Sequence, residues 1–306
     1  NILMEWFTGV IEDINDPMMM NRVRVRCFGI HTNNLSKIKL ENLPWALVML
    51  PTTSSGVNGL RQSIHGLLNG SWVVGFFRDG AGKQDPIIMG TVASTSLVGP
   101  DKTVGFNDPS GTYPKATHLE EPDVNRLARA GDKETDIPTL KTDSVTTEVP
   151  DALGATWSEP VTPYAPVYPF NTVNESLSGH VNEVDDTKGA ERLHEYHKSG
   201  TFKEIHPDGT TVTRIKLDNY EIVYGNDFCN IKGNVALTIN ANCSTYIKGN
   251  WDVKVDGEVK HVFAKTLTTE VGGDVTETFS SNQTTNVSGN IDIDAVVNQD
   301  GDNDLY

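Results

Sequence analysis

A glycine-rich run at residues 75–83 is the first place where residue types suggest chemistry, because loops of this kind can bind phosphate groups. Such a loop needs two glycines five positions apart, here Gly75 and Gly80, with a lysine directly after the second and then Ser or Thr. Ala81 stands where the lysine is needed, and Gln84 follows Lys83 in place of Ser or Thr. We therefore expect a surface hairpin here rather than a nucleotide site.

Histidines are the next candidates, because imidazole nitrogens are common metal ligands. His194 and His197 would point to opposite faces of a strand, which argues against chelation, so we expect structural roles for them and for His206. His261 remains a candidate metal ligand. In a trimer, three copies of it would meet on the axis and bind an ion, or form a ring of hydrogen-bonded neutral imidazoles. We predict no cofactor and no catalytic residue.

Three arginines at alternating positions, Arg22, Arg24 and Arg26, would share one face of a strand. Such a face could bind an oligonucleotide or sugar, or form ion pairs against a protein partner. The whole chain carries 25 Lys and Arg against 41 Asp and Glu, a net charge of −16. This balance argues against nucleic-acid binding, which needs a surplus of basic residues.

The cysteines and the acidic end of the chain do not suggest a metal site. Cys27, Cys229 and Cys243 have no metal-binding or disulfide spacing, and we expect Cys229 and Cys243 to lie in a core. The acidic residues at 300–304 lack the spacing of a calcium loop, so we expect a solvated end or a docking face for a tip protein.

The elements that must position these residues differ along the chain. Residues 1–95 are expected to form an OB-fold barrel, because an alternating run at 22–26 and further strand-like runs at 46–50, 72–77 and 87–92 are separated by turn residues. Within residues 5–95 there are 8 basic and 7 acidic residues, which leaves 17 basic and 34 acidic residues for the remainder.

Residues 96–178 contain many prolines and are expected to form an extended linker, with a helical turn only at 124–130. Strands are expected to resume from about residue 179, at 194–197, 202–206, 211–215 and 220–224, and residues 179–222 are expected to be the β-strand entry to a needle. This part would lead the chain into residues 223–306, where an eight-residue repeat begins.

The repeat has glycine at one position and an apolar residue two positions earlier. Ala241, Lys265 and Ser281 replace glycine in three of the nine repeats. The glycines are Gly225, Gly233, Gly249, Gly257, Gly273 and Gly289. The apolar residues include Val223, Ile231, Ile239, Ile247, Val255, Val271 and Val287, with Phe263 and Phe279 completing the row. Nine consecutive repeats predict a repetitive β-structure.

Parity along the repeat distinguishes a β-helix from a series of hairpins. From 223 to 294, 27 of the 36 odd positions are apolar or glycine, against 7 of the 36 even positions. In a two-residue hairpin the residues i and i+3 that flank the turn lie on the same face, so inward positions would change from odd to even at each turn. Here the inward positions stay odd throughout. The pattern predicts a β-helix, made either by one chain with three repeats per coil or by three chains. Small and polar inward residues, such as Thr245 and Thr285, favour a narrow axis shared by a trimer.

Several motifs resemble those of the central spike proteins of contractile-tail phages of the T-even kind and, more distantly, of type VI secretion spikes. The matching stretches are residues 6–13, 16–17, 21–26, 29–31, 43–45, 51–53, 90–91, 178–180, 185–187, 189, 191–192 and 206–209, together with the repeats. The resemblance implies an all-β protein with an N-terminal OB barrel, a linker and a homotrimeric triple-stranded β-helix.

The same resemblance implies a structural role in injection. The spike would be a virion protein of the tail baseplate, assembled in the bacterial cytoplasm, and would cross the host outer membrane transiently. Its OB domain would dock on a baseplate hub ring protein, and a tip protein would bind the C-terminal end. The T-even relatives carry a lysozyme domain between barrel and needle, and residues 96–178 are too short for one, so we expect no enzymatic activity.

Two other functions remain open from the residues. A β-helical tail spike can degrade polysaccharide, but this needs a groove with acidic and aromatic residues. The even positions of the repeat offer only Tyr224, Phe228 and Tyr246 as aromatics. A spike of a type VI or other phage-derived secretion device has the same sequence features as a phage spike.

Overall fold

A computed structural model of the protein describes residues 4–61, 64–112, 118–131 and 136–294. The chain forms two units, residues 1–241 and 242–306, which we describe separately. The elements, in chain order, are β1 (Glu5–Asp13), β2 (Val23–Cys27), η1 (Leu40–Asn42), β3 (Trp45–Val48), β4 (Trp72–Phe77), η2 (Gly80–Gly82), β5 (Pro86–Thr91), η4 (Leu127–Arg129), α1 (Ile137–Asp143), β6 (Val149–Pro150), β7 (Thr156–Trp157), β8 (Asn171–Glu175), β9 (Val181–Asp185), β10 (Arg192–Tyr196), β11 (Phe202–Ile205) and β12 (Thr211–Arg214). Among these described residues, no helix has the length and apolar character needed to cross a membrane.

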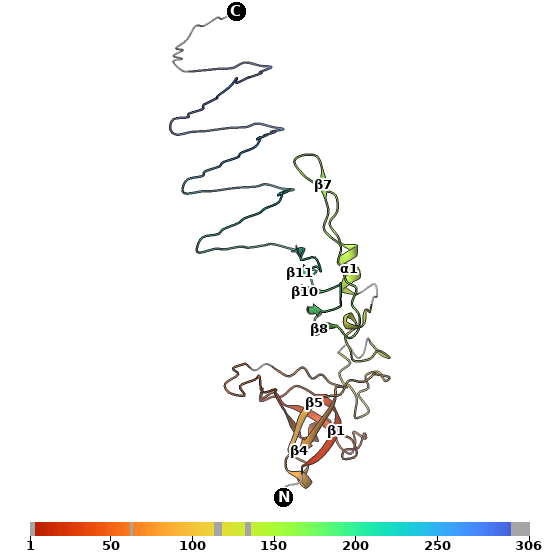
Figure 1. Ribbon diagram of the computed structural model, residues 1–306. Helices are drawn as coiled ribbons and strands as arrows, with labels where there is room; N and C mark the ends of the chain where they lie inside the picture. The colour runs from red at the N-terminus through yellow and green to blue at the C-terminus, as the bar shows by residue number, and fades with distance from the viewer. Residues whose placement is uncertain (1–3, 62–63, 113–117, 132–135, 295–306) are drawn as a thin grey trace, which may run out of the picture. The chain divides into compact units, whose positions relative to one another are not determined.

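The first five strands close into a small barrel in the order β1-β2-β3-β5-β4 (Figure 1). All pairs are antiparallel except β3 and β5, which pair in parallel. The strands expected at 22–26, 46–50, 72–77 and 87–92 correspond to β2, β3, β4 and β5. Residues 75–83 form the end of β4 and the turn that leads to β5, as expected for a hairpin.

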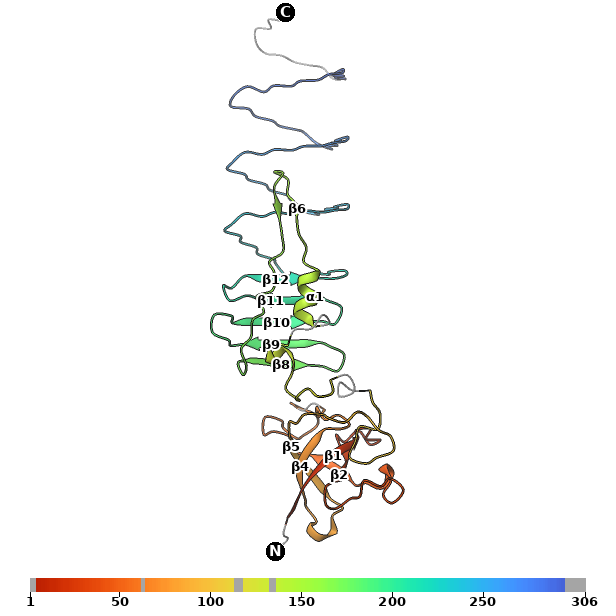
Figure 2. The ribbon, with the colours of Figure 1, turned by 90° about the vertical axis from the view of Figure 1, so that its right-hand side faces the viewer.

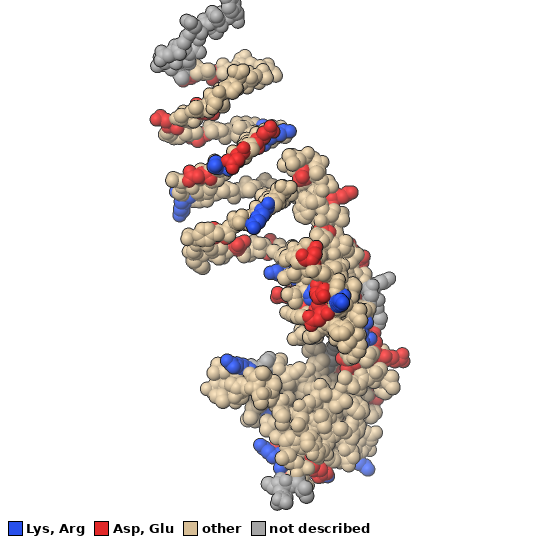
Figure 3. Space-filling model, in the orientation of Figure 1, with Lys and Arg blue, Asp and Glu red and all other residues tan. Residues whose placement is uncertain are grey.

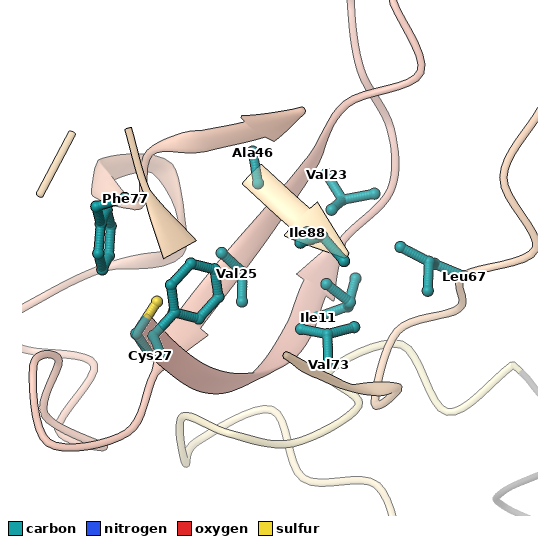
Figure 4. Packing of buried hydrophobic residues seen from close by; sticks show 10 residues of the cluster. Ile11, Val23, Val25, Cys27, Ala46, Leu67, Val73, Phe77 and Ile88 are labelled. Carbon is teal, nitrogen blue, oxygen red and sulfur yellow. The ribbon is translucent and has the colours of Figure 1, made fainter. Parts of the chain in front are cut away.

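The barrel interior is filled by apolar side chains from all five strands and by Leu67 of the loop before β4 (Figure 4). The cluster consists of Phe7, Ile11, Val23, Val25, Cys27, Ala46, Leu67, Val73, Phe77 and Ile88. Burial raises the pKa of the Cys27 thiol to about 12, so this cysteine stays protonated and behaves as a small apolar residue. The alternation seen in the sequence is therefore the in-and-out pattern of a closed barrel.

Residues 96–178 are more structured than the expected extended linker. The chain near Val104 bridges to Asn34 of the barrel, and Thr95 bridges to Pro122. A short helix, α1, follows, with Pro138 in its first turn, where a missing N–H costs no hydrogen bond. The strands β6 and β7 form a two-stranded sheet.

Strands β8 to β12 form an antiparallel meander in sequence order, which we call the meander sheet (Figure 2). β10, β11 and β12 correspond to the expected strands at 194–197, 202–206 and 211–215. Each hairpin turn ends on a glycine with positive φ, between 82° and 92°, which avoids Cβ strain. These glycines are Gly179, Gly189, Gly200 and Gly209.

Beyond the meander sheet the chain is extended and turns from corner to corner (Figure 1). We call residues 217–294 the octad segment. No backbone–backbone hydrogen bond joins these residues to one another or to the rest of the described chain. The strand expected at 220–224 is accordingly absent, because an extended run is a β-strand only when a neighbouring strand bonds to it.

Candidate assembly surface

The octad segment bends at regular intervals that coincide with the repeat in the sequence. Paired bends lie at residues 224–225, 232–233, 240–241, 248–249, 256–257, 264–265, 272–273, 280–281 and 288–289. The second residue of each pair is a glycine of the repeat or its substitute, Ala241, Lys265 or Ser281. Unlike the glycines of the meander sheet, none of the octad glycines in the described chain has a positive φ. The chain therefore turns corners without reversing direction.

These glycines have no function that a single chain explains. A Cβ atom built on Gly225, Gly233 or Gly249 would meet nothing within 4 Å, and the same holds for Gly257, Gly273 and Gly289. Glycine within an extended segment costs about 0.5–1 kcal/mol relative to alanine, because the unfolded chain gains conformational freedom. Neither a positive φ nor close contact with the same chain therefore explains why glycine stands at these positions.

The apolar row of the repeat is less exposed than the aromatic residues at even positions. The side chains two positions before each bend glycine, from Val223 to Val287, are 44–56% exposed. The aromatics at even positions, Tyr224, Phe228 and Tyr246, are 83–101% exposed. Except for the half-buried Thr238, every residue of the octad segment is exposed. The segment presents a continuous apolar row and unpaired backbone groups, which is what strand addition requires.

The other candidate residues of this region have no intrachain site. Cys229 and Cys243, expected in a core, are exposed in the single chain. His261 is exposed, and its ring lies 6.1 Å from that of Phe263. The acidic residues at 300–304 lie outside the described residues.

Arg22, which precedes β2, and Arg24 and Arg26 of β2 are all paired within the barrel region. Arg26 is fully buried, and its guanidinium donates to both carboxylate oxygens of Glu12, at 2.6 and 3.1 Å. Arg22 pairs with Asp16, and Arg24 donates to the backbone carbonyls of Leu40 and Leu43. Figure 3 shows no continuous basic patch on the visible face of the barrel. The arginines are therefore ion-paired within the chain, and Arg26 is not on a surface, which argues against an oligonucleotide site here.

The histidines of the meander sheet contribute to structure, as expected. His194 is buried, and its Nδ1 lies 2.7 Å from Glu183 Oε2. His206 Nε2 lies 3.2 Å from Glu204 Oε2. His197 is exposed beside His180, with ring centroids 4.4 Å apart. Within the described ranges, no group of three His, Cys, Asp or Glu residues is placed to hold a metal ion.

A buried ionic cluster, which the sequence did not reveal, joins the linker to the meander sheet. Lys141 of α1 lies 2.7 Å from Glu204, and Arg192 lies 2.9 Å from Glu204 and 2.7 Å from Glu183. We call Lys141, Glu183, Arg192, His194 and Glu204 the ionic cluster; each side chain is at most 4% exposed. Two cations face two anions, so the cluster is neutral while His194 is unprotonated.

Burial and pairing oppose each other in setting the pKa values of the cluster. Burial raises the pKa of Glu183, but hydrogen bonds from His194 and Arg192 and the Arg192 charge outweigh it, which lowers the pKa to about 2. Burial lowers the pKa of His194 and keeps it neutral. Burial also lowers the pKa of Lys141 to about 8, against the attraction of Glu204. Lys141 Nζ therefore donates to His194 Nε2 at 3.4 Å, and Nδ1–H donates to Glu183.

An apolar cluster completes the contact between linker and sheet. Val181, Tyr196, Phe202 and Val212 of the sheet pack with Leu127, and Ile137 and Tyr164 of the linker pack against them. The Tyr164 hydroxyl donates to the Leu127 carbonyl at 2.8 Å. One face of the meander sheet is therefore closed by the chain's own linker.

Comparison with known proteins places these features in a family. A family model described as the Gp5 N-terminal OB domain matches residues 29–167. The chain is 40% identical over 278 residues to "Protein Gp5" of Vibrio phage KVP40, covering 80% of this chain and 66% of that protein. It is 38% identical over 117 residues to the "Pre-baseplate central spike protein Gp5" of Enterobacteria phage T4, covering 37% of this chain. The chain spans about two thirds of the first relative's length and a fifth of the second's.

Proposed function

The chain belongs to the Gp5 family of phage proteins, and we propose that it is the structural central spike of a contractile-tail baseplate, which pierces the host envelope during injection. The observation that carries the proposal is the octad segment. Its apolar row and open backbone groups run the length of residues 217–294 without an intrachain partner. Piercing an envelope is the function that suits a long, narrow and repetitive β-structure.

We propose further that the octad segment forms a homotrimeric triple-stranded β-helix. Neighbouring chains would supply the backbone hydrogen bonds that each chain lacks. They would also approach the bends closely, which explains glycines that are neither crowded nor at positive φ in one chain. Ala241, Lys265 and Ser281 at three bends indicate that this approach differs between layers.

We propose that the spike has four parts, residues 1–95, 96–178, 179–222 and 223–306. Its partners other than copies of itself would bind the first part and the end of the last. The barrel region, with 8 basic and 7 acidic residues in 5–95, suits a contact with a baseplate hub ring protein. A tip protein would bind the C-terminal end, and the host outer membrane would be crossed transiently. The protein would act in the virion after assembly in the host cytoplasm.

We also propose that the spike has no lytic activity of its own. Between the barrel and the meander sheet, the described residues form only η4, α1 and the short strands β6 and β7. A helical lysozyme domain needs far more chain than this segment provides.

Light scattering on the full chain tests the proposed trimer, and a pair of adjacent substitutions tests its packing. Ile239→Asp places three carboxylates near one axis, where ionised groups lack solvent and partners. We expect the wild-type protein to be a trimer that resists dissociation in unheated SDS, because three strands must unfold together. Ile239→Asp should abolish this resistance.

Asn240→Asp is the matched control, because it adds the same charge at the next position, on the opposite face. It should leave the trimer intact. A folded monomer of the wild-type chain, or equal effects of the two substitutions, would reject the trimeric needle and with it the proposed spike.

A further inference from the structure

The linker carries an ordered hairpin that presents apolar side chains to solvent. We call residues 146–159, which include β6 and β7, the linker hairpin. Its turn is fixed by Asp151, whose Oδ1 accepts hydrogen bonds from the backbone N–H groups of Leu153 and Ala155, both at 2.9 Å. Leu153 is nevertheless 91% exposed and Trp157 is 44% exposed. A turn this well defined, with apolar side chains in water, has the features of a contact surface.

The linker hairpin contacts the chain beyond the linker at two levels. Near its base, Glu159 pairs with Arg214 of β12 at 2.6 Å. Further along, the Pro150 carbonyl accepts a hydrogen bond from the Thr238 hydroxyl at 2.6 Å. The residues at 214 and 238 are 24 positions apart, which is three repeats of the octad segment. The chain therefore returns to the same side of its path after three repeats.

The distance between the two contacts exceeds one strand spacing. Thr156 pairs with Pro150 and lies three residues before Glu159, while Thr146 bonds to Glu159 and lies four residues before Pro150. Three or four extended residues span about 10–13 Å, and the Glu159 and Arg214 side chains add to this reach. Neighbouring strands lie only about 4.8 Å apart, and three such spacings make about 14 Å. One coil of the chain therefore leaves room for two further strands.

In the proposed trimer, the two other copies supply these strands. Each copy passes every side of the helix in turn, with one repeat of eight residues on each side. On the side where the hairpin meets Thr238, the strands below are centred eight and sixteen residues earlier in the sequence. They are the strand around residue 230 of one neighbour and the strand around residue 222 of the other. The linker hairpin must cross both to reach from Arg214 to Thr238.

The outward-facing residues of these two strands are unusually apolar. Thr238 contacts the hairpin from an even position, so even positions face outward here. Among the 11 even positions from 216 to 236, four carry a large apolar side chain that is 75–101% exposed. They are Tyr220, Ile222, Tyr224 and Phe228. Among the 28 even positions from 240 to 294, only Tyr246 and Val262 are of this kind. Apolar outward residues are thus concentrated where the hairpin crosses.

We infer that the linker hairpin docks across the octad strands of two other copies of this chain, with Trp157 against the strand that carries Phe228. This inference rests on the proposed trimer and adds an outer contact to it. Each hairpin holds its own chain at Arg214 and Thr238 and the two neighbouring chains between these levels. Successive layers at the start of the octad segment are thereby tied together from outside.

Cysteine accessibility in the full-length protein tests whether the hairpin covers these strands. The parent protein carries Cys229→Ser and Cys243→Ser, and Cys27 remains as a buried, unreactive thiol. Phe228→Cys places a thiol beneath the hairpin. Val262→Cys is the matched control, because Val262 has the same parity, is 77% exposed and lies three repeats beyond the upper contact of the hairpin. Light scattering first establishes the mass of each protein.

We expect maleimide to react about tenfold more slowly with the cysteine at 228 than with the cysteine at 262, because a covered thiol reacts only when the contact opens. Adding Trp157→Asp should raise the rate at 228 to that at 262, since a charge weakens an apolar contact. A trimer in which both cysteines react equally fast overturns this inference and leaves the proposed spike standing. The same holds if Trp157→Asp changes neither rate.

Cross-linking identifies which copy lies beneath the hairpin. Thr156→Cys and Asn230→Cys, combined in the same parent protein, are treated with a short bismaleimide. Linked dimers and trimers on heated SDS gels are expected, because the two thiols that meet belong to different copies. A trimer that yields only monomer bands overturns this inference and again leaves the spike standing. A parent protein that is monomeric by light scattering overturns the proposed trimer, and the inference with it.

Discussion

Lys141 connects two parts of the chain that are far apart in sequence. Its ammonium group contacts Glu204 and His194 and lies 4.1 Å from the centre of the Phe202 ring. All three partners belong to the meander sheet, while Lys141 belongs to α1 of the linker. A buried ion pair adds little net stability when complete, but losing one partner leaves a buried charge without compensation. The ionic cluster therefore holds α1 on the meander sheet, and removal of any one charged member should destabilise this contact.

Replacing Lys141 tests whether the ionic cluster holds the linker on the meander sheet. Lys141→Met leaves Glu204 buried with Arg192 as its remaining cationic partner, and we expect it to lower the local stability of the meander sheet by about 3 kcal/mol. Amide hydrogen exchange in β10 and β11 measures this change. Lys188→Met, in the exposed turn after β9, is the control and should change stability by less than about 0.5 kcal/mol. Equal protection in both variants would contradict the assignment.

Acid should loosen the same cluster through Glu183. The pKa of Glu183 is about 2 in the folded chain, against an ordinary 4.5, because its hydrogen bonds and Arg192 outweigh burial. Its contribution is fully present above pH 4.5 and is lost as the pH falls through 2, and the difference corresponds to about 3 kcal/mol. Hydrogen exchange in β9 should accelerate over this window. Glu183→Gln should remove that pH dependence, and Glu148→Gln, on an exposed residue, should retain it.

At the scale of elements, two glycines of the barrel differ in what surrounds them. A Cβ on Gly75 of β4 would collide with the Ile87 carbonyl and the Phe7 ring, whereas a Cβ on Gly90 of β5 would meet nothing within 4 Å. Neither residue has a positive φ. Gly75 is therefore required by the close approach of β4 and β5, which the barrel's curvature imposes.

Alanine at each position separates the two cases. We expect Gly75→Ala to destabilise the barrel by about 1–3 kcal/mol, because the strands must separate to admit a methyl group. Gly90→Ala should be neutral or slightly stabilising, because it restricts only the unfolded chain. Urea unfolding followed by exchange of the β1 and β4 amides measures both. A loss at Gly90 equal to that at Gly75 would show that the barrel is not this tightly closed.

The success of sequence-based prediction for each element depended on which side chains its strands bury. β2 was predicted because its inward valines alternate with arginines, and β4 and β5 because they are short apolar runs between turn residues. β8 and β9 were not, because Asn171, Glu183 and Asp185 occupy positions that face inward. Polar inward residues hide the alternation, and their partner Lys141 comes from a distant helix that no local pattern indicates. The bends of the repeat were the easiest feature, since they recur nine times.

The molecule as a whole divides its charge unevenly. Residues 5–95 are close to neutral, and the rest of the chain holds 17 basic and 34 acidic residues. From residue 266 to the end there is no Lys or Arg. An acidic, polar outer surface keeps a long repetitive structure soluble and opposes its association side by side.

The absence of lytic activity is a prediction for the whole protein. We expect purified full-length protein to leave the turbidity of a peptidoglycan suspension unchanged, because no part of the described linker has room for a hydrolase domain. A lysozyme added to the same suspension serves as the positive control. Turbidity loss that disappears when an acidic residue of this chain is replaced would contradict the prediction.

The spacing of the bends makes the octad segment a modular length of chain. Eight is an even number, so inserting or deleting one repeat leaves every later side chain on its original face, whereas a shift of one residue would exchange inside and outside from that point on. Such a segment can grow or shrink by duplication of a 24-base unit of coding sequence without redesign of its cross-section. The length of this segment is thus adjustable in fixed increments of eight residues, without any change to the sequence of the barrel.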